Sequence, residues 1–234
     1  MSTPPKTSKP RRKKGAAEPP APSPRIARRE RRRERSREEI VEAARRVLLK
    51  NGVAGTTLDA VAQEAGLTKA ALYYYFPSKD ALYFEVMFGV FDTQTMAIQN
   101  AVAKATTGPE ALRALIGETV RSFAGQLDDF RLAFLHSQVV KPGTVRLTPD
   151  QFQRLRPLND RMYGGATKLV AADAERKRGR TVIEPRLMAF LASTAALGLL
   201  TMKGLVESFG DPLLYSDETL IDGLARVFEA AAAR

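Results

Sequence analysis

The chain of 234 residues contains no cysteine and a single histidine, His136. The absence of cysteine excludes disulfide bonds, thiolate metal sites and cysteine nucleophiles, and it is compatible with a reducing cytoplasm, where we expect the protein to reside. One histidine without any cysteine also argues against a metal as effector, because transition-metal sites depend largely on these two residue types. We therefore predict that the protein holds neither a metal nor a cofactor.

The sequence signatures of catalysis are missing as well. The chain has no phosphate-binding loop, no dinucleotide-binding fingerprint and no nucleophile elbow. Ser137 or Asp129 could be paired with His136, but adjacent residues on a helix point about 100° apart, so Ser137 and His136 do not readily form a nucleophile and its base. We predict that the protein is not an enzyme.

One uncharged apolar stretch raises the question of a membrane span. Residues 187–202 carry no charge, but a spanning helix needs about 20 apolar residues. This stretch also contains hydroxyl residues and glycine, and Arg186 and Lys203 bound it closely. We therefore predict a helix that is buried on nearly all sides, and no membrane as a partner.

The stretch from Thr57 to Lys79, TLDAVAQEAGLTKAALYYYFPSK, predicts two short helices joined by a tight turn. The first helix stops at Gly66, since glycine best adopts the left-handed conformation that closes a helix. The second helix begins after its N-cap Thr68 and cannot continue through Pro77, which lacks an amide hydrogen. Helices joined by so short a turn cross steeply, and the small Ala62 allows their close approach. The pattern indicates a helix-turn-helix.

The second of these helices is predicted to present a face of small residues and tyrosines. At about 100° per residue, Leu72 and Phe76 point inward together, whereas Tyr74 lies opposite them. The alternative, that the tyrosines simply pack between helices, is weakened because Tyr74 cannot share the side of Leu72. Small side chains let a helix enter a major groove, where tyrosine hydroxyls can bond phosphates or base edges. The predicted DNA-binding residues of this region are Thr57, Thr68, Lys69, Ala70, Ala71, Tyr73, Tyr74 and Lys79.

In this register the residues resemble the N-terminal domain of the tetracycline repressor (TetR) family, over about residues 37–90. The resemblance rests on Thr56-Thr57, Val61-Ala62, Ala65-Gly66, Thr68-Lys69, Leu72-Tyr73-Tyr74-Tyr75-Phe76, Ser78-Lys79 and Ala81-Leu82. It implies an all-helical dimer with a three-helix DNA-binding domain and a larger C-terminal domain that dimerises and holds a small-molecule effector. It also implies DNA contacts at Thr57, Lys69, Ala71, Tyr73, Tyr74 and Lys79. The family often has His at position 74 and Gly or Thr at positions 70 and 71, which leaves the operator sequence open.

The net charge of +11 is concentrated at the start of the chain. Residues 1–37 contain 14 Lys or Arg and 3 Glu, and the remainder carries equal numbers of basic and acidic residues. Seven of the 14 prolines also lie in this part, so residues 1 to about 25 are predicted to be disordered. The tail is either an arm that binds phosphate or a solubilising extension, and we favour the arm, with Arg32 and Arg33 as contacts.

Capping signals divide the N-terminal region into helices. Ser36 and Glu39 form a capping box at the predicted start of the first helix, which ends at Gly52. Thr56 is the predicted start of the second helix. Ser78 is predicted to cap a fourth, longer helix, whose many apolar positions suggest that it packs on both domains and links them mechanically.

The rest of the chain keeps helical periodicity without sustained alternation, so we predict an all-α fold. The domains expected are a disordered basic tail (1–35), a helix-turn-helix domain (36–82) and a helical effector-binding and dimerisation domain (83–234). Further helices are expected near 110–126, 128–140, 149–176, 184–209 and 216–232.

The last two helices are the predicted homodimer interface. Small residues between 192 and 198 would allow close helix packing, and Leu220, Leu224 and Val227 share one face of the last helix. In the TetR family the corresponding helices form a four-helix bundle across the two-fold axis. Dimerisation would place two DNA-binding domains about one DNA turn apart, so the operator should be nearly palindromic.

The effector site has no recognisable sequence signature. A few aromatic and polar residues could line an apolar cavity, although residues of these types are more often part of a plain core. The candidates are Phe91, Phe123, Phe134, His136 and Tyr163. We predict a dimeric repressor that binds double-stranded DNA and leaves its operator when an unknown small-molecule effector binds. The alternative is a sequence-tolerant DNA-coating protein driven by the basic tail.

Overall fold

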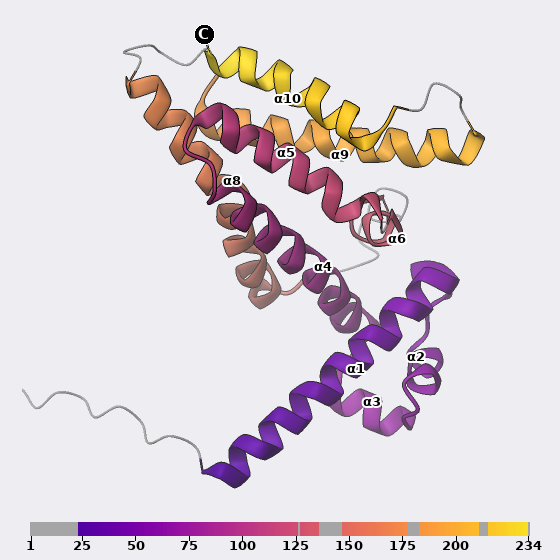
Figure 1. Cartoon of the computed structure of the whole chain (residues 1–234). Coiled ribbons are helices and arrows are strands. Elements are labelled where there is room, and N and C mark those ends of the chain that lie inside the picture. Colours follow the sequence, from indigo (N-terminus) through magenta and orange to yellow (C-terminus); the bar gives the residue numbers. More distant parts are fainter. Residues whose placement is uncertain (1–22, 126, 136–146, 177–182, 211–214, 234) are drawn as a thin grey trace, which may run out of the picture. The chain divides into compact units, whose positions relative to one another are not determined.

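The computed structural model describes residues 23–125, 127–135, 147–176, 183–210 and 215–233 (Figure 1). These residues form α-helices and one π-helical turn, with no strand among them, which confirms the predicted all-α class. The chain divides into two units, Met1–Arg37 and Glu38–Arg234. Within the second unit we call residues 38–82 the head and residues 83–234 the large domain.

The first helix, α1 (Pro24–Gly55), begins earlier than predicted. The predicted start at Ser36 is wrong, because residues 25–35 consist mainly of arginine and glutamate, which favour helix, and contain no internal glycine or proline. Proline is itself well suited to a first helical position, where no amide hydrogen is needed. The tail was predicted to be disordered, but the part of it that the structure describes is helical from Pro24. Residues 1–22 lie outside the described residues.

The connection between the first two helices depends on two neighbouring threonines. Gly52 has a φ of 67° and ends the regular part of α1, as predicted. Thr56 does not start the second helix: it is buried, and its hydroxyl donates to the carbonyl of Gly52 at 2.7 Å. Thr57 is the N-cap of α2 (Leu58–Glu64), with its hydroxyl accepting from the amide of Ala60 at 3.1 Å. Thr56 therefore satisfies the carbonyl of Gly52 at the end of α1, and Thr57 caps α2.

The helix-turn-helix follows the predicted geometry. Gly66 has a φ of 66°, and the carbonyl of the buried Ala62 accepts from the amide of Leu67 at 2.8 Å. Thr68 caps α3 (Lys69–Tyr75), with its hydroxyl accepting from the amide of Ala71 at 3.2 Å. Leu72 and Phe76 are buried in the head core, so the opposite side of α3 faces outward.

Helix α4 (Lys79–Val102) belongs to both cores of the second unit. Ser78 caps it, with the hydroxyl accepting from the amide of Ala81 at 3.1 Å. Its N-terminal half contributes Leu82 and Val86 to the head core, and its C-terminal half contributes Ile98 to the core of the large domain. A single helix that packs in both cores can transmit a displacement from one to the other.

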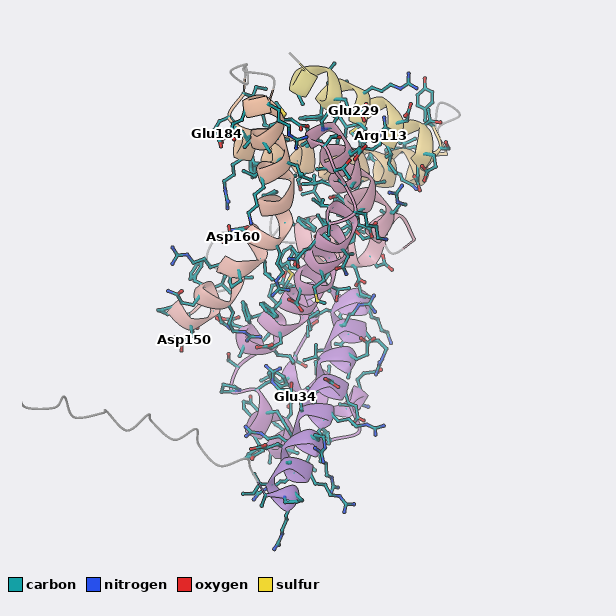
Figure 2. All side chains as sticks on the ribbon, turned by 60° about the vertical axis from the view of Figure 1, so that its left-hand side comes forward. Glu34, Arg113, Asp150, Asp160, Glu184 and Glu229 are labelled. Atoms are coloured by element: carbon teal, nitrogen blue, oxygen red, sulfur yellow. The ribbon has the colours of Figure 1, made fainter. Side chains whose placement is uncertain are left out.

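The large domain consists of α5 (Gly108–Ala124), α6 (Leu127–Phe130), the π-helical turn η1 (Arg131–Leu135), α8 (Pro149–Arg176), α9 (Pro185–Phe209) and α10 (Asp217–Ala233). The helix predicted at 128–140 is thus a short α-helical turn followed by η1, and its last residues lie outside the described part of the chain. Helix α5 runs beside α9 and α10 (Figure 1). Arg113 fixes α5 to α10 through an ion pair with Glu229 at 2.6 Å (Figure 2) and a second one with Asp222 at 2.9 Å.

The prediction that residues 187–202 are buried on nearly all sides is wrong. By length and composition Pro185–Val206 could cross a membrane, with a mean hydropathy of 1.6, and 28% of this stretch is buried; a single helix of this kind is weak evidence for a span. Small residues such as Ala189 and Ala192 face the core, which leaves the opposite side of the helix outward. The exposed apolar side chains of α9 are Leu187, Phe190, Leu191, Met202, Leu205 and Phe209.

Candidate nucleic-acid interface and ligand pocket

The outward face of α3 carries two exposed tyrosines. Tyr73 is 44% exposed and Tyr74 is 64% exposed, whereas Leu72 on the inward face of the helix is fully buried. The ring of Tyr74 meets that of Tyr75 edge-on, with centroids 5.2 Å apart. Because α3 is held on its buried side by the head core, these rings are presented on a fixed backbone.

Lys69, at the start of α3, is held by a residue that the sequence analysis missed. Its ammonium lies 2.9 Å from the carboxylate of Asp59 in the first turn of α2, and this hydrogen bond is the main cause of the raised pKa of Lys69. Both side chains are exposed, and exposed ion pairs are weak. Lys69 can therefore exchange Asp59 for a phosphate at little cost. This pair could have been predicted from the helix-turn-helix geometry, because that geometry brings the first turns of α2 and α3 together.

The other predicted DNA-binding residues are distributed over both units. Thr57, Thr68 and Ala70 are exposed, and Ala71 and Lys79 are half-buried. Arg32 and Arg33 are exposed on the part of α1 that belongs to the first unit. The head thus gathers the threonines, alanines, tyrosines and lysines on α2, α3 and the start of α4, and all these DNA contacts remain predictions.

A groove of about 510 Å³ opens in the large domain between α4, η1 and α8. Its apolar lining consists of Phe91, Phe134, Phe152, Leu155, Leu158 and Met162. Its polar lining consists of Thr95, Gln153, Arg156, Asn159 and Tyr163. A mostly apolar concavity with a few polar groups is typical of small-molecule sites. We call it the α8 groove.

Three of the predicted effector-binding residues, Phe91, Phe134 and Tyr163, line the α8 groove. Phe123 lies behind it, buried against Phe130 and Phe134 with ring centroids 5.7 Å from each. His136 lies outside the described residues. Apart from Tyr163, the lining from α8 was not predicted, because helical periodicity does not identify which face of α8 its neighbours leave uncovered.

The arginines of α8 differ in their partners. Arg154 makes two contacts with the carboxylate of Glu85 on α4, and its guanidinium also lies over the rings of Phe84 and Phe88. Its pKa is raised, first of all by the hydrogen bond to Glu85. Arg161 and Arg176 pair with Asp92 at 2.6 Å and with Asp173 at 3.4 Å. Arg156 pairs with no carboxylate among the described residues.

Helix α8 also contains Pro157 within its pocket-lining half. A proline inside a helix cannot donate to the carbonyl four residues earlier, here that of Gln153. The backbone of α8 is therefore one hydrogen bond short at the wall of the α8 groove.

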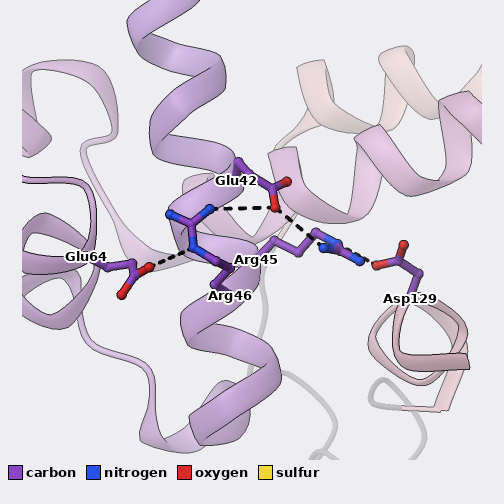
Figure 3. Close-up of polar contacts among 5 residues, drawn as sticks. All are labelled: Glu42, Arg45, Arg46, Glu64 and Asp129. Atoms are coloured by element: carbon purple, nitrogen blue, oxygen red, sulfur yellow. Dashed lines mark hydrogen bonds and ion pairs between the residues drawn. The ribbon is translucent and has the colours of Figure 1, made fainter. Parts of the chain in front are cut away.

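Residues of α6 and η1 connect the groove region to the head. The guanidinium of Arg45 on α1 bonds the carboxylate of Asp129 at 2.6 Å, and this bond is the main cause of its raised pKa (Figure 3). Leu132 of η1 is buried in the head core, and its carbonyl accepts a long hydrogen bond of 3.5 Å from the hydroxyl of Tyr83. Burial raises the pKa of Tyr83 to about 12.

Phe134, two residues after Leu132, faces the other region. Its ring meets Phe91 edge-on, with centroids 5.1 Å apart, and it lines the α8 groove. One π-helical turn therefore places one side chain in the head core and another in the groove wall. This arrangement links the two regions through a route that does not pass along α4.

No group of three acidic, histidine or cysteine side chains is positioned to hold a metal ion in the described part of the chain. The predicted absence of a metal site stays a prediction.

Comparison with known proteins identifies the head. The sequence profile of "Bacterial regulatory proteins, tetR family" matches residues 40–86. The HTH-type transcriptional regulator RutR of Escherichia coli is 43% identical over 53 residues, which are 23% of this chain and 25% of RutR. The HTH-type transcriptional activator FasR of Mycolicibacterium smegmatis is 28% identical over 104 residues, 44% of this chain and 48% of FasR. The matched part thus spans a quarter to a half of these relatives.

Solved structures share the fold over most of the chain. The regulator FadR of Bacillus subtilis, in complex with stearoyl-CoA, superposes with a TM-score of 0.65 at 13% identity and covers 83% of this chain and 98% of its own. AibR, in complex with isovaleryl coenzyme A and operator DNA, gives 0.59 at 21% identity, with coverage of 82% and 97%. The fold therefore extends the likeness beyond the head. The head, matched over residues 40–86, is therefore a helix-turn-helix domain of the TetR family of bacterial regulators.

Proposed function

We propose that the protein is a sequence-specific DNA-binding repressor that acts as a homodimer in the cytoplasm and leaves a near-palindromic operator when a small amphipathic effector binds. The observation that carries this proposal is the outward face of α3, where Tyr73 and Tyr74 are exposed on a helix whose other side is buried. Large aromatic side chains in such a position are suited to contact base edges and phosphates.

The exposed face of α9 supports the homodimer. Leu187, Leu191 and Leu205 recur along this face at helical spacing, and Val227 of α10 is 65% exposed. A contiguous apolar face is typical of a protein interface. A second copy of the chain, packed on α9 and α10 about a two-fold axis, would cover it and fix the spacing of two heads. Leu191→Glu should then produce monomers in sedimentation analysis, while Lys104→Glu in the exposed turn after α4 should not.

Release requires that the effector binds the DNA-free conformation more tightly than the DNA-bound one. In our proposal, the α8 groove is the effector site and η1 is one route of coupling, because Phe134 lines the groove while Leu132 is buried in the head core. The apolar lining suits a ligand with an apolar chain. Acyl-coenzyme A ligands in FadR and AibR are consistent with this class.

The decisive experiment is the selection of fragments of the source genome on the purified protein at near-physiological salt, followed by sequencing. A few enriched fragments that share a near-palindrome would support the proposal. Uniform recovery of fragments would contradict it.

Uniform recovery would instead favour the second candidate, a DNA-coating protein, for which the charge distribution gives a reason. The net charge of +11 resides entirely in residues 1–37, and binding driven by phosphate neutralisation has little sequence preference. Deletion of residues 1–27 separates the two. A repressor with a supporting arm should lose affinity and part of its salt dependence but keep discrimination, whereas a coating protein should lose binding to all DNA alike.

A further inference from the structure

Arg156 is the single charged side chain that lines the α8 groove among the described residues. The other three arginines of α8 each have a carboxylate partner, as described above. No carboxylate in the described part of the chain pairs with Arg156. The groove wall therefore carries one positive charge that no acidic residue of this lining balances.

The polar residues of the groove are arranged in a row. Gln153, Arg156 and Asn159 follow each other at intervals of three residues, which places them along one ridge of α8. Phe91 and Phe134 contribute the aromatic lining from α4 and η1. A ligand in this groove would thus meet an apolar surface on one side and a polar ridge with a guanidinium on the other.

A guanidinium next to an apolar surface selects anions. Its planar fork of donors matches the oxygens of a carboxylate or a phosphate, and charge-assisted hydrogen bonds of this kind are about twice as strong as neutral ones. Arg156 is exposed at the groove wall, so solvent screens this contact, and the apolar lining contributes separately by burying the chain of the ligand. Neutral amphipaths gain only the apolar part, and cationic ones are repelled.

On this basis, and resting on the effector role proposed for the groove, we propose that the α8 groove binds an anionic amphipath, an apolar chain with a carboxylate or phosphate head, and that Arg156 holds the head. Arg156 is then the residue that determines the charge of the accepted ligand. The apolar lining sets affinity for the chain without regard to the head.

The test compares ligands that share one chain and differ in the head. Binding to the full-length protein is measured by calorimetry, with each ligand kept below its micelle concentration. The ligands are lauric acid, lauryl phosphate, lauroyl-coenzyme A, lauryl alcohol and laurylamine. We expect the acid or the phosphate to bind about tenfold more tightly than the alcohol, as one charge-assisted contact predicts, and the amine to bind most weakly. Preference for the acid, the phosphate or the coenzyme ester distinguishes the sources of the anionic head.

Three variants connect the preference to Arg156. Arg156→Gln should remove the roughly tenfold advantage of the anionic ligand and leave the alcohol unchanged. Arg156→Lys, which keeps the charge, should restore part of the advantage. Lys104→Gln removes one positive charge from an exposed turn outside the groove and should change nothing.

Equal affinities of the acid, phosphate, ester and alcohol for the unmodified protein would overturn the proposal, and so would a loss of acid and alcohol binding alike in Arg156→Gln. The same samples are tested for operator binding without ligand. If operator binding is specific while anionic ligands have no advantage, the inference about the head is wrong and the DNA-binding function stands. If no operator is bound, the proposed function itself fails.

Discussion

The head and the large domain use aromatic residues in opposite ways. In the head, Phe76 is buried while Tyr73 and Tyr74 on the same helix are exposed. In the large domain, Phe91, Phe123, Phe130 and Phe134 pack on one another, with ring centroids between 5.1 and 5.7 Å apart. The first arrangement leaves the rings exposed on the surface, and the second gathers them at the wall of a groove.

The difference shows how each region keeps its shape. The backbone under the exposed tyrosines is fixed by a short turn, two caps and a buried face, so their exposure does not depend on the partner. The phenylalanine cluster ends at an open groove, so a ligand that covered its exposed apolar surface would gain free energy from the burial. A rigid presenting surface and an adaptable enclosing one are the two components that a ligand-controlled DNA-binding protein requires.

The largest effect should come from Phe76, the buried aromatic of the head. Phe76→Ala should lower the free energy of unfolding by about 3–5 kcal/mol, because it leaves a cavity in the head core. Tyr74→Ala, two residues away, should change it by less than about 0.5 kcal/mol, since the ring is exposed. Urea denaturation followed by circular dichroism measures both. Similar losses in the two variants would contradict the proposed division of roles on α3.

Leu132→Ala tests the connection between the regions. Truncation of this buried side chain should destabilise the protein by about 2–4 kcal/mol. It should also weaken the effect of effector binding on operator affinity, because the head core loses its contact with η1. Operator titrations with and without ligand measure the coupling, with Leu49→Ala at an exposed position of α1 as the control. Undiminished coupling would mean that α4 alone carries the signal.

Tyr74→Ala should affect DNA rather than stability. We expect specific operator binding to weaken by about 1–3 kcal/mol, the range for a lost base contact, while non-specific binding stays nearly unchanged. Fluorescence anisotropy with operator and scrambled duplexes gives both affinities. Tyr215→Ala removes another exposed tyrosine, on the large domain, and should leave both affinities intact. An equal loss on both duplexes would show that Tyr74 contacts phosphate alone.

The ion pair between Arg45 and Asp129 should contribute a smaller amount. A double-mutant cycle with Arg45→Gln and Asp129→Asn should give a coupling energy of about 1 kcal/mol, since the pair is only partly buried. The same cycle on Arg46 and Glu64, which are more exposed, should give less. A larger coupling for the exposed pair would indicate that burial does not determine the strength of these contacts.

A pH-dependent effect concerns the ionisation of Tyr83. Burial raises its pKa to about 12 in the folded protein, whereas an unfolded tyrosine ionises near about 10. Between these values the unfolded chain loses a proton that the folded chain retains, so stability falls as pH rises, by up to about 1.4 kcal/mol per pH unit. Tyr83→Phe should lack this component. The measurement is the unfolding free energy of both proteins at pH 9 to 11. The difference between the two proteins should change with pH, and a difference that stays constant would refute the prediction.

Much of the head could be predicted from the sequence because its determinants are local. The caps Thr68 and Ser78, the glycine at position 66 and the inward register of Leu72 each follow from residues within one or two helical turns. The misassignments had local causes too: Thr56 bonds a carbonyl instead of capping α2, and the arginine-rich stretch before Ser36 is simply helical.

The groove and its connections could not be predicted, since they depend on residues far apart in the chain. Leu132 enters the head core from a segment about fifty residues beyond it, and no periodicity identifies such an insertion. Arg156 stands out only after the partners of the other α8 arginines are known. The open face of α9 was predicted as buried because the sequence shows that a surface is apolar, not whether its own chain covers it.

Pro157 gives the two walls of the α8 groove unequal compliance. The wall formed by α4 has an unbroken helix, whereas the first two turns of α8, which carry Phe152 and Arg156, join the rest of their helix across the missing bond to the carbonyl of Gln153. A ligand larger than the groove would therefore be accommodated by bending α8 rather than α4. The bend of α8 at Pro157 would then increase with the chain length of the ligand. One site could thus give a graded response to ligands that differ only in chain length.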